Sequence, residues 1–332
     1  MIMNKVRPGL RTVTLALTMF GIGNLVVTSP ATAAISADEF NEVINKSKQV
    51  FGPIVAQHGA ELIIEGFYDT TSDGAMATRS RDHKKWFVRM WGGMPKFPSA
   101  TPDTVTIILC HELGHHLGGY PFYSHDSDEW AASEGQADYW ATQACTRLLW
   151  KDDTAENARY AGITNTQCES SFSTEDEINL CKRAYRAAEL NAPYEGKTSG
   201  GRPAITKRDR SVTRELFVTH PGGQCRVDSM HMGLLCNVSF DFTRIPGRNN
   251  PAGQNTISAE TEARSSSCFG RDVESARSRP LCWFKESTAE QAPGGDPFEK
   301  SHARSDIISL KEIPNVLSEL WAEEDNLPWL IN

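Results

Sequence analysis

The 332-residue sequence lacks several features that would place it in common classes of protein. It has no run of basic residues and its formal net charge is −8, so we expect no nucleic-acid partner. Beyond residue 33, no stretch is long and apolar enough to span a bilayer, and no segment is repeated. No CxxC motif occurs, which argues against a structural zinc knuckle. Apolar residues make up 39% of the chain, which suffices for a packed core.

The first 33 residues have the order of a secretory signal peptide. Three basic residues precede an apolar stretch over 13–27, and the small-x-small sequence Ala31-Thr32-Ala33 follows it. A membrane anchor is the alternative, but the apolar stretch is short and is interrupted by two glycines and an asparagine. We therefore predict that residues 1–33 are removed. The mature chain is expected to be secreted or periplasmic, with no stable membrane insertion.

All eight cysteines follow this segment. An even number of cysteines in an exported chain predicts disulfides. Proximity in the sequence is the only guide to their pairing, and it suggests three bridges: Cys168–Cys181, Cys225–Cys236 and Cys268–Cys282. Cys110 lies in an apolar run and fits a buried free thiol equally well.

Helix and strand signals together predict an α+β fold. The capping box Ser36-x-x-Glu39 begins a helix that Gly52-Pro53 would end near Phe51. Apolar segments between turn residues predict strands at 62–68, 75–78 and 86–91, the last two joined as a hairpin through 79–85. Further helices are predicted within 101–117, 127–150, 174–189 and 314–324, with a loop over 192–210.

The composition changes near Pro246. Gly, Pro, Ser and Asn become frequent beyond this point, and two of the cysteines lie there. We therefore expect one domain over 34–245 and a loop-rich, disulfide-stapled C-terminal extension over 246–332 that ends in a short helix.

The helix at 101–117 carries the motif HExxH. Thr101-Pro102-Asp103 supplies an N-cap, a proline at the first position and an acid. His111 and His115 are four residues apart, so both imidazoles lie on one helical face and can reach one metal ion. Glu112 points alongside that face, where a carboxylate can take a proton from a metal-activated water.

Two histidines are too few for catalytic zinc, which usually has three protein ligands and an open position. A third histidine six residues after His115 would complete the zinc-binding pattern HExxHxxGxxH, but Pro121 occupies that position. His116 points about 100° away on the helix and is expected to pack or to support the ligands. The remaining candidate is Glu134 on the next predicted helix, with Asp138 one turn on to orient a ligand histidine.

The combination of these motifs resembles one family of peptidases. HExxH followed by Glu134-x-x-Ala137-Asp138 is similar to the gluzincins of the HtpX, BepA and CAAX prenyl protease type. The segment from His220 to Arg226 resembles the HPxxxxR segment of that branch. The resemblance covers residues 60 to 240, without the membrane helices that some members have. It implies a zincin-like domain over 34–245, with the HExxH helix packed on a small antiparallel sheet.

The resemblance also implies roles for other residues. His220 and Arg226 would face the zinc and help to hold the substrate or the tetrahedral intermediate, which needs a donor beyond the metal. Tyr123, His125 and Tyr139 are weaker candidates for that task.

The strand at 86–91 just precedes the HExxH helix. In gluzincins an edge strand there pairs with the extended substrate, which would make Trp86, Val88 and Met90 substrate-binding residues. An internal hairpin strand is the alternative reading of the same segment.

The sequence therefore predicts a zinc-dependent endopeptidase with one Zn²⁺ per chain and a protein or peptide as substrate. Glu112 would be the general base, and His111, His115 and Glu134 the zinc ligands. Two alternatives stay open. The first is a non-catalytic peptide-binding or chaperone-like protein on a zincin scaffold. The second is a structural zinc site, with His116 or His220 as a fourth ligand.

Overall fold

The computed structural model describes residues 35–123, 129–268 and 278–286. The predicted signal peptide and the predicted helix at 314–324 lie outside these ranges. The described helices and strands are, in order, α1 (Ala37–Gln57), β1 (Glu61–Phe67), β2 (Ala75–Arg79), β3 (Lys85–Trp91), α2 (Pro102–Leu117), α3 (Glu134–Trp140), the π-helix η1 (Ala141–Cys145), α4 (Thr146–Trp150), α5 (Thr154–Ala158), α6 (Thr166–Ser171), α7 (Glu175–Ser199), α8 (Gly223–Leu235), α9 (Ile257–Ala263) and the short 3₁₀ turn η2 (Arg264–Ser266).

The predicted α+β class is confirmed in its coarse form, because the described chain combines many helices with one small sheet. The sheet has the strand order β1-β3-β2. β2 and β3 form the predicted antiparallel hairpin, in which Ala77 pairs with Val88. β1 and β3 are parallel, so the prediction of a purely antiparallel sheet is wrong. Local turn signals determine a hairpin, but they carry no information on which side of it a third strand adds.

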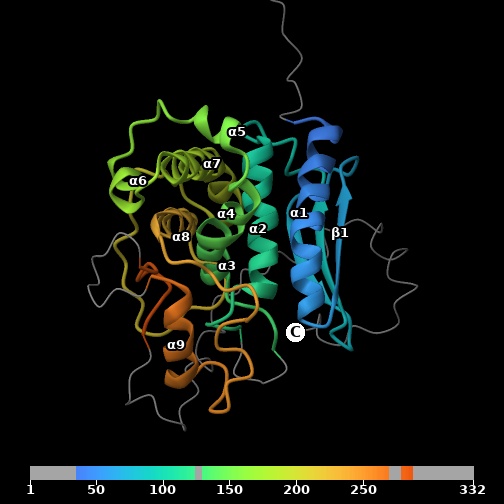
Figure 1. Cartoon of the computed structure of the whole chain (residues 1–332), viewed down its shortest axis with the longest axis vertical. Helices are drawn as coiled ribbons and strands as arrows, with labels where there is room; N and C mark the ends of the chain where they lie inside the picture. Colours follow the sequence, from blue (N-terminus) through green and yellow to red (C-terminus); the bar gives the residue numbers. More distant parts are fainter. Residues whose placement is uncertain (1–34, 124–128, 269–277, 287–332) are drawn as a thin grey trace, which may run out of the picture. The chain divides into compact units, whose positions relative to one another are not determined.

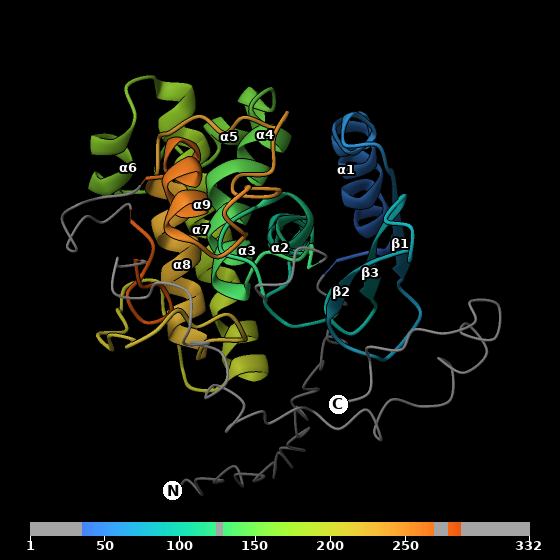
Figure 2. The same ribbon diagram turned by 90° about the horizontal axis from the view of Figure 1, so that it is seen from below.

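Helix α2 lies between the sheet with α1 and the group of helices that includes α3, α7 and α8 (Figures 1 and 2). Every residue of α2 from Asp103 to Leu117 is buried, as expected of a helix enclosed on all sides. Its start matches the prediction, since the Thr101 hydroxyl accepts from the Thr104 amide and Pro102 stands at the first helical position.

Helix α1 continues beyond its predicted end. It begins at the predicted capping box of Ser36 and Glu39, but it runs through Pro53 to Gln57. A proline inside a helix costs about 3 kcal/mol. Val55 extends the buried face of the helix and is fully enclosed by the core. We attribute the continuation to this packing, which a rule based on proline alone omits.

Two other helices differ from their predicted ranges. Within the described part of 127–150, residues 129–133 are not helical, and the helix starts only at Glu134. The Ala132 amide donates to the His115 carbonyl, which holds this segment against the end of α2. Helix α7 runs to Ser199, so the predicted loop over 192–210 is wrong over 192–199. The side chains at 192, 194 and 195 are buried, which keeps this last part of α7 on the core.

Four disulfides join the eight cysteines: Cys110–Cys145, Cys168–Cys181, Cys225–Cys282 and Cys236–Cys268. Only Cys168–Cys181 was predicted correctly, and Cys110 is not a free thiol. Cys225 and Cys236 lie at opposite ends of α8, about 16 Å apart at 1.5 Å per residue, which is too far for a bridge. Each therefore pairs with a cysteine of the C-terminal region instead.

The C-terminal region reaches the core through Trp283. Its ring is fully buried, and its indole N–H donates to the Ser229 hydroxyl on α8 at 2.8 Å. None of the described helices has the length and apolar character that a bilayer crossing needs.

Candidate metal centre

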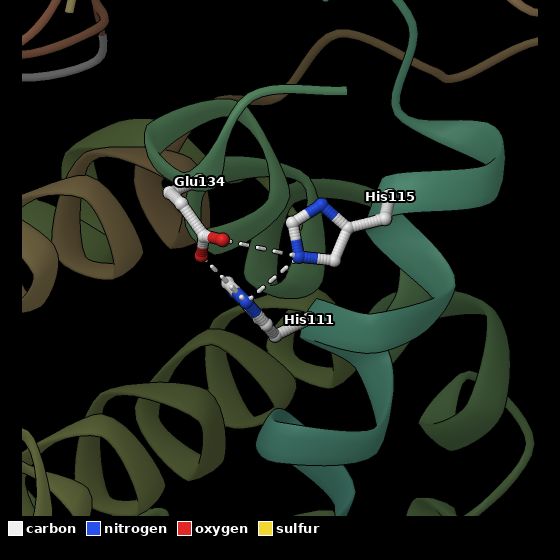
Figure 3. A group of neighbouring side chains, drawn as sticks. All are labelled: His111, His115 and Glu134. Atoms are coloured by element: carbon white, nitrogen blue, oxygen red, sulfur yellow. Dashed lines mark hydrogen bonds and ion pairs between the residues drawn. The ribbon is translucent and has the colours of Figure 1, made fainter. Parts of the chain in front are cut away.

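The structure brings three predicted ligand residues to one point. His111 and His115 lie one turn apart on α2, and their Nε2 atoms are 3.2 Å apart. The Glu134 carboxylate comes from the first turn of α3, with Oε2 3.1 Å from His111 Nε2 and Oε1 3.7 Å from His115 Nε2. Figure 3 shows the three side chains converging from the two helices. All three are buried.

Close packing of α2 on α3 makes this convergence possible. Gly114, inside the HExxH motif, faces Ala137 on α3. A Cβ atom at residue 114 would lie 2.9 Å from the Ala137 Cα, so a larger residue would force the helices apart. The Glu134 amide also donates to the Val218 carbonyl at 3.1 Å, which anchors the start of α3. The sequence contains Gly114 within the motif, but its spacing role is visible only once α3 is placed.

Each of the two imidazoles is held in its orientation by an oxygen atom next to its Nδ1. The Nδ1 of His111 lies 2.8 Å from Asp138 Oδ1, the contact expected of a residue one turn after Glu134. The Nδ1 of His115 lies 2.8 Å from the Ala132 carbonyl oxygen. These acceptors favour the tautomers with the proton on Nδ1, which leaves both Nε2 atoms free to bind a cation.

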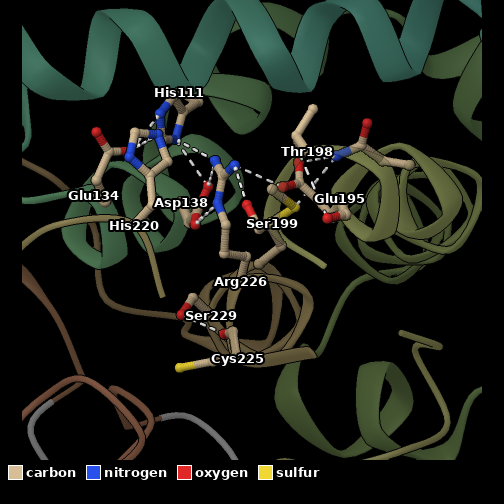
Figure 4. A network of polar contacts seen from close by, with 12 residues as sticks. His111, Glu134, Asp138, Glu195, Thr198, Ser199, His220, Cys225, Arg226 and Ser229 are labelled. Carbon is tan, nitrogen blue, oxygen red and sulfur yellow. Dashed lines mark hydrogen bonds and ion pairs between the residues drawn. The ribbon is translucent and has the colours of Figure 1, made fainter. Parts of the chain in front are cut away.

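Arg226 has a different position from the predicted one. Its guanidinium binds Asp138 in a bidentate manner, with two contacts of 2.8 Å, and it pairs with Glu195 on α7 at 2.7 Å (Figure 4). The side chain is buried and is not among the residues that line the cavity. Arg226 therefore holds the carboxylate that orients His111, which corrects the oxyanion role predicted for it. Glu195, in the segment predicted as a loop, was not anticipated.

The three residues border a cavity of about 870 Å³. Glu112 and His220 also line it, and the His220 Nε2 lies 3.3 Å from Glu134 Oε2. The His220 side chain is 61% exposed, so it faces the open space of the cavity. Tyr123 lies opposite and donates its hydroxyl proton to Glu134 Oε1. Tyr139 is buried away from the cavity, and His125 lies outside the described residues.

The electrostatics of the three candidate ligands favour the binding of a cation. Burial lowers the pKa of His111, but Asp138 and Glu134 outweigh burial and raise this pKa to about 10. Burial raises the pKa of Glu134, yet His220, His115 and His111 outweigh it and hold this pKa well below its usual range. Burial lowers the pKa of His115, so that ring stays neutral. Without a metal, a proton on His111 supplies the positive charge that the two carboxylates stabilise.

His111, His115 and Glu134 can therefore hold a metal ion. The buried Oε2 of Glu134 has no hydrogen-bond partner, although it lies beside two imidazole nitrogens, and a bound cation would satisfy it. The only other group with ligand spacing in the described ranges is Asp209 with Cys225 and Cys282, whose sulfurs form a disulfide and cannot bind as thiolates.

The strand that borders the cavity is β2, not β3. β3 is the central strand, and Trp86, Val88 and Met90 are buried, so their predicted role in binding substrate at an edge is wrong. The alternative reading of 86–91 as an internal hairpin strand is the observed one. β2 lies at the edge of the described sheet, and several of its residues line the cavity.

His116 is a packing residue. Its ring stacks between Trp86 and Trp130, at centroid distances of 5.1 and 4.7 Å. Its Nε2 contacts the Phe87 carbonyl at 3.1 Å, and its Nδ1 accepts from Arg79 at 3.2 Å. Both nitrogens are therefore engaged away from the metal site.

No family model matches the chain, and neither a curated protein nor a solved structure matches it.

Proposed function

We propose that this protein is a zinc-dependent endopeptidase with a zincin-like domain. The observation that carries the proposal is the convergence of His111, His115 and Glu134 at the wall of an open cavity, with Glu112 beside them. Two imidazoles and one carboxylate are a typical protein ligand set for catalytic zinc. The resemblance of the three sequence motifs to gluzincins supports the same choice of metal and reaction.

The number of protein ligands favours a catalytic over a structural site. A structural zinc usually has four protein ligands. His116 is engaged elsewhere, and in the described ranges no other His, Cys, Asp or Glu completes the cluster at ligand spacing. A zinc ion held by three ligands would polarise a peptide carbonyl and increase the acidity of a water molecule.

Glu112 is placed to act as the general base. Its carboxylate is buried on the cavity wall, and burial raises its pKa to about 7. It would accept the proton of the attacking water as the C–O bond forms, and it would deliver that proton to the amine as the C–N bond breaks. His220, exposed to the cavity beside Glu134, would donate a hydrogen bond to the oxyanion.

The edge of β2 is the surface on which an extended substrate would bind. Its residues Ala75 and Ala77 line the cavity and have small side chains that leave room for a peptide backbone. A peptide can add to such an edge through main-chain hydrogen bonds, with side-chain pockets giving specificity.

The disulfides favour a location outside the cytoplasm. Four bridges are compatible with an oxidising compartment, such as the periplasm or the extracellular medium. Together with the N-terminal signal pattern, they support the proposal that the protein is exported.

Cleavage of unfolded casein, with and without a chelator, tests the proposal. We expect cleavage that the chelator abolishes and that added zinc restores. Glu112→Gln should keep the metal and lower kcat by about 10³-fold, within the range of a general base. A Glu112→Gln variant with full activity would refute the mechanism. Casein binding without cleavage by the zinc-loaded native chain would favour the alternative of a peptide-binding protein.

A further inference from the structure

A second charged feature of the cavity lies away from the metal site. Arg79, the last residue of β2, lines the cavity, although it is only 5% exposed. Its guanidinium carbon lies 3.7 Å from the centroid of the Trp86 ring and 4.8 Å from that of Trp130. Nε and Nη2 donate to Nδ1 and the carbonyl oxygen of His116, both at 3.2 Å. The guanidinium is therefore held in one orientation.

This buried cation has no carboxylate partner among the described residues. Within the residues that the structure describes, Arg79 forms no ion pair, and no acceptor binds its Nη1. Arg226, which is also buried, differs in this respect because it pairs with two carboxylates. Burial and, to a smaller extent, nearby Arg248 lower the pKa of Arg79 to about 8, although Glu129 opposes the shift. An unpaired buried charge is costly, and a bound anion would relieve that cost.

The charged residues near Arg79 do not cancel its positive charge. Arg248 is half-buried and close enough to Arg79 to affect its pKa, and its Nη1 donates to the Trp130 carbonyl. Among the described residues, Glu129 is the one carboxylate that affects the pKa of both arginines, so these three side chains together carry one excess positive charge. The chain as a whole has a formal net charge of −8, so the charge at this end of the cavity is opposite in sign to the net charge of the protein.

Arg79 also has a defined spacing from the reacting centre. Ala77, two residues earlier on the same face of β2, lines the cavity with Glu112, and its backbone is close enough to that carboxylate to lower the pKa of Glu112. The backbone at Arg79 is then about 7 Å further along the strand, at 3.3 Å per residue. A peptide aligned with β2 would therefore place a side chain about two residues from the cleaved bond beside Arg79.

We propose that the cavity selects a peptide with a glutamate or aspartate about two residues from the cleaved bond, and that Arg79 binds this carboxylate. The proposal rests on the peptidase function. Arginine suits the task because its planar guanidinium can present paired donors to one carboxylate. Trp86 and Trp130 hold the guanidinium in place, so little side-chain freedom is lost on binding.

Cleavage of a peptide library by the zinc-loaded mature chain tests this specificity. We expect acidic residues to be enriched at one position within three residues of the cleaved bond. Arg79→Met should raise KM for an acidic peptide roughly 10- to 100-fold, as expected for lost hydrogen bonds to a charged group, and leave the neutral glutamine analogue unchanged. Arg89→Met is the matched control, because Arg89 lies on β3, pairs with Glu65 and does not line the cavity. A library without acidic enrichment would overturn the proposal.

A binding assay separates this proposal from the peptidase function. Fluorescence anisotropy of the acidic and neutral peptides on Glu112→Gln should give a lower Kd for the acidic one, and adding Arg79→Met should remove the difference. If the acidic and the neutral peptide bound Glu112→Gln with equal affinity, the proposed role of Arg79 would be wrong. If the native chain cleaves nothing while Glu112→Gln still prefers the acidic peptide, the peptidase function fails and the anion-binding role of Arg79 stands.

Discussion

Removal of the Cys110–Cys145 disulfide should weaken metal binding as well as the fold. Cys110 immediately precedes His111 on α2, and Cys145 ends the π-helix that continues the helix carrying Glu134. The bridge therefore ties together the two helices that supply all three ligands. Its sequence separation is 35 residues, for which loop entropy gives a loss of about 4 kcal/mol in the free energy of unfolding.

The double variant Cys110→Ala/Cys145→Ala tests this, with Cys168→Ala/Cys181→Ala as the matched control. Cys168–Cys181 spans 13 residues, which corresponds to a loss of about 3 kcal/mol, but it joins α6 to α7 and touches no ligand. Urea unfolding should show a comparable loss of stability in both variants. Competition with a chromogenic chelator should show weaker zinc binding only in the first.

Equal zinc affinity in the two variants would refute the idea that the bridge positions the ligand helices. A loss of affinity in both, in proportion to stability, would show that metal binding follows the global fold only.

Three further predictions concern residues that position the ligands or the helices that carry them. Asp138→Asn should weaken zinc binding about 10- to 100-fold, because His111 loses the carboxylate that orients it, and chelator competition measures this. Arg226→Met should lower the free energy of unfolding by about 3–5 kcal/mol in urea, since it removes the arginine that pairs with two buried carboxylates; an unchanged midpoint would contradict the ion-pair account. Gly114→Ala should cost about 1–3 kcal/mol through its contact with Ala137, and calorimetry should show a lower Tm.

Signals that are local in the sequence predicted their elements well. The cap at Thr101 gave the start of α2, and the four-residue spacing of His111 and His115 placed both imidazoles together. The apolar face around Glu134 indicated a second buried helix, and the structure places it against α2. These features depend on helix geometry, which short segments determine by themselves.

Features that depend on contacts between distant segments were not predictable in this way. The parallel addition of β1, the bridges from α8 to the C-terminal region and the continuation of α1 through Pro53 all depend on tertiary packing. Within the site, the motif from His220 to Arg226 indicated that Arg226 is important, but it did not indicate which atoms Arg226 would contact. No sequence signal indicated Arg79, because the feature that distinguishes it is its burial without a carboxylate partner in the part of the chain that the structure describes.

We expect one zinc ion to bind to His111, His115 and Glu134 and to leave a position open to the cavity. Anomalous diffraction at the zinc edge, from crystals of the mature chain grown with zinc, tests it most directly. The anomalous map should show one peak within bonding distance of both Nε2 atoms and a Glu134 oxygen, with no fourth protein ligand. A peak elsewhere, no peak at all, or a fourth protein ligand on the ion would contradict it.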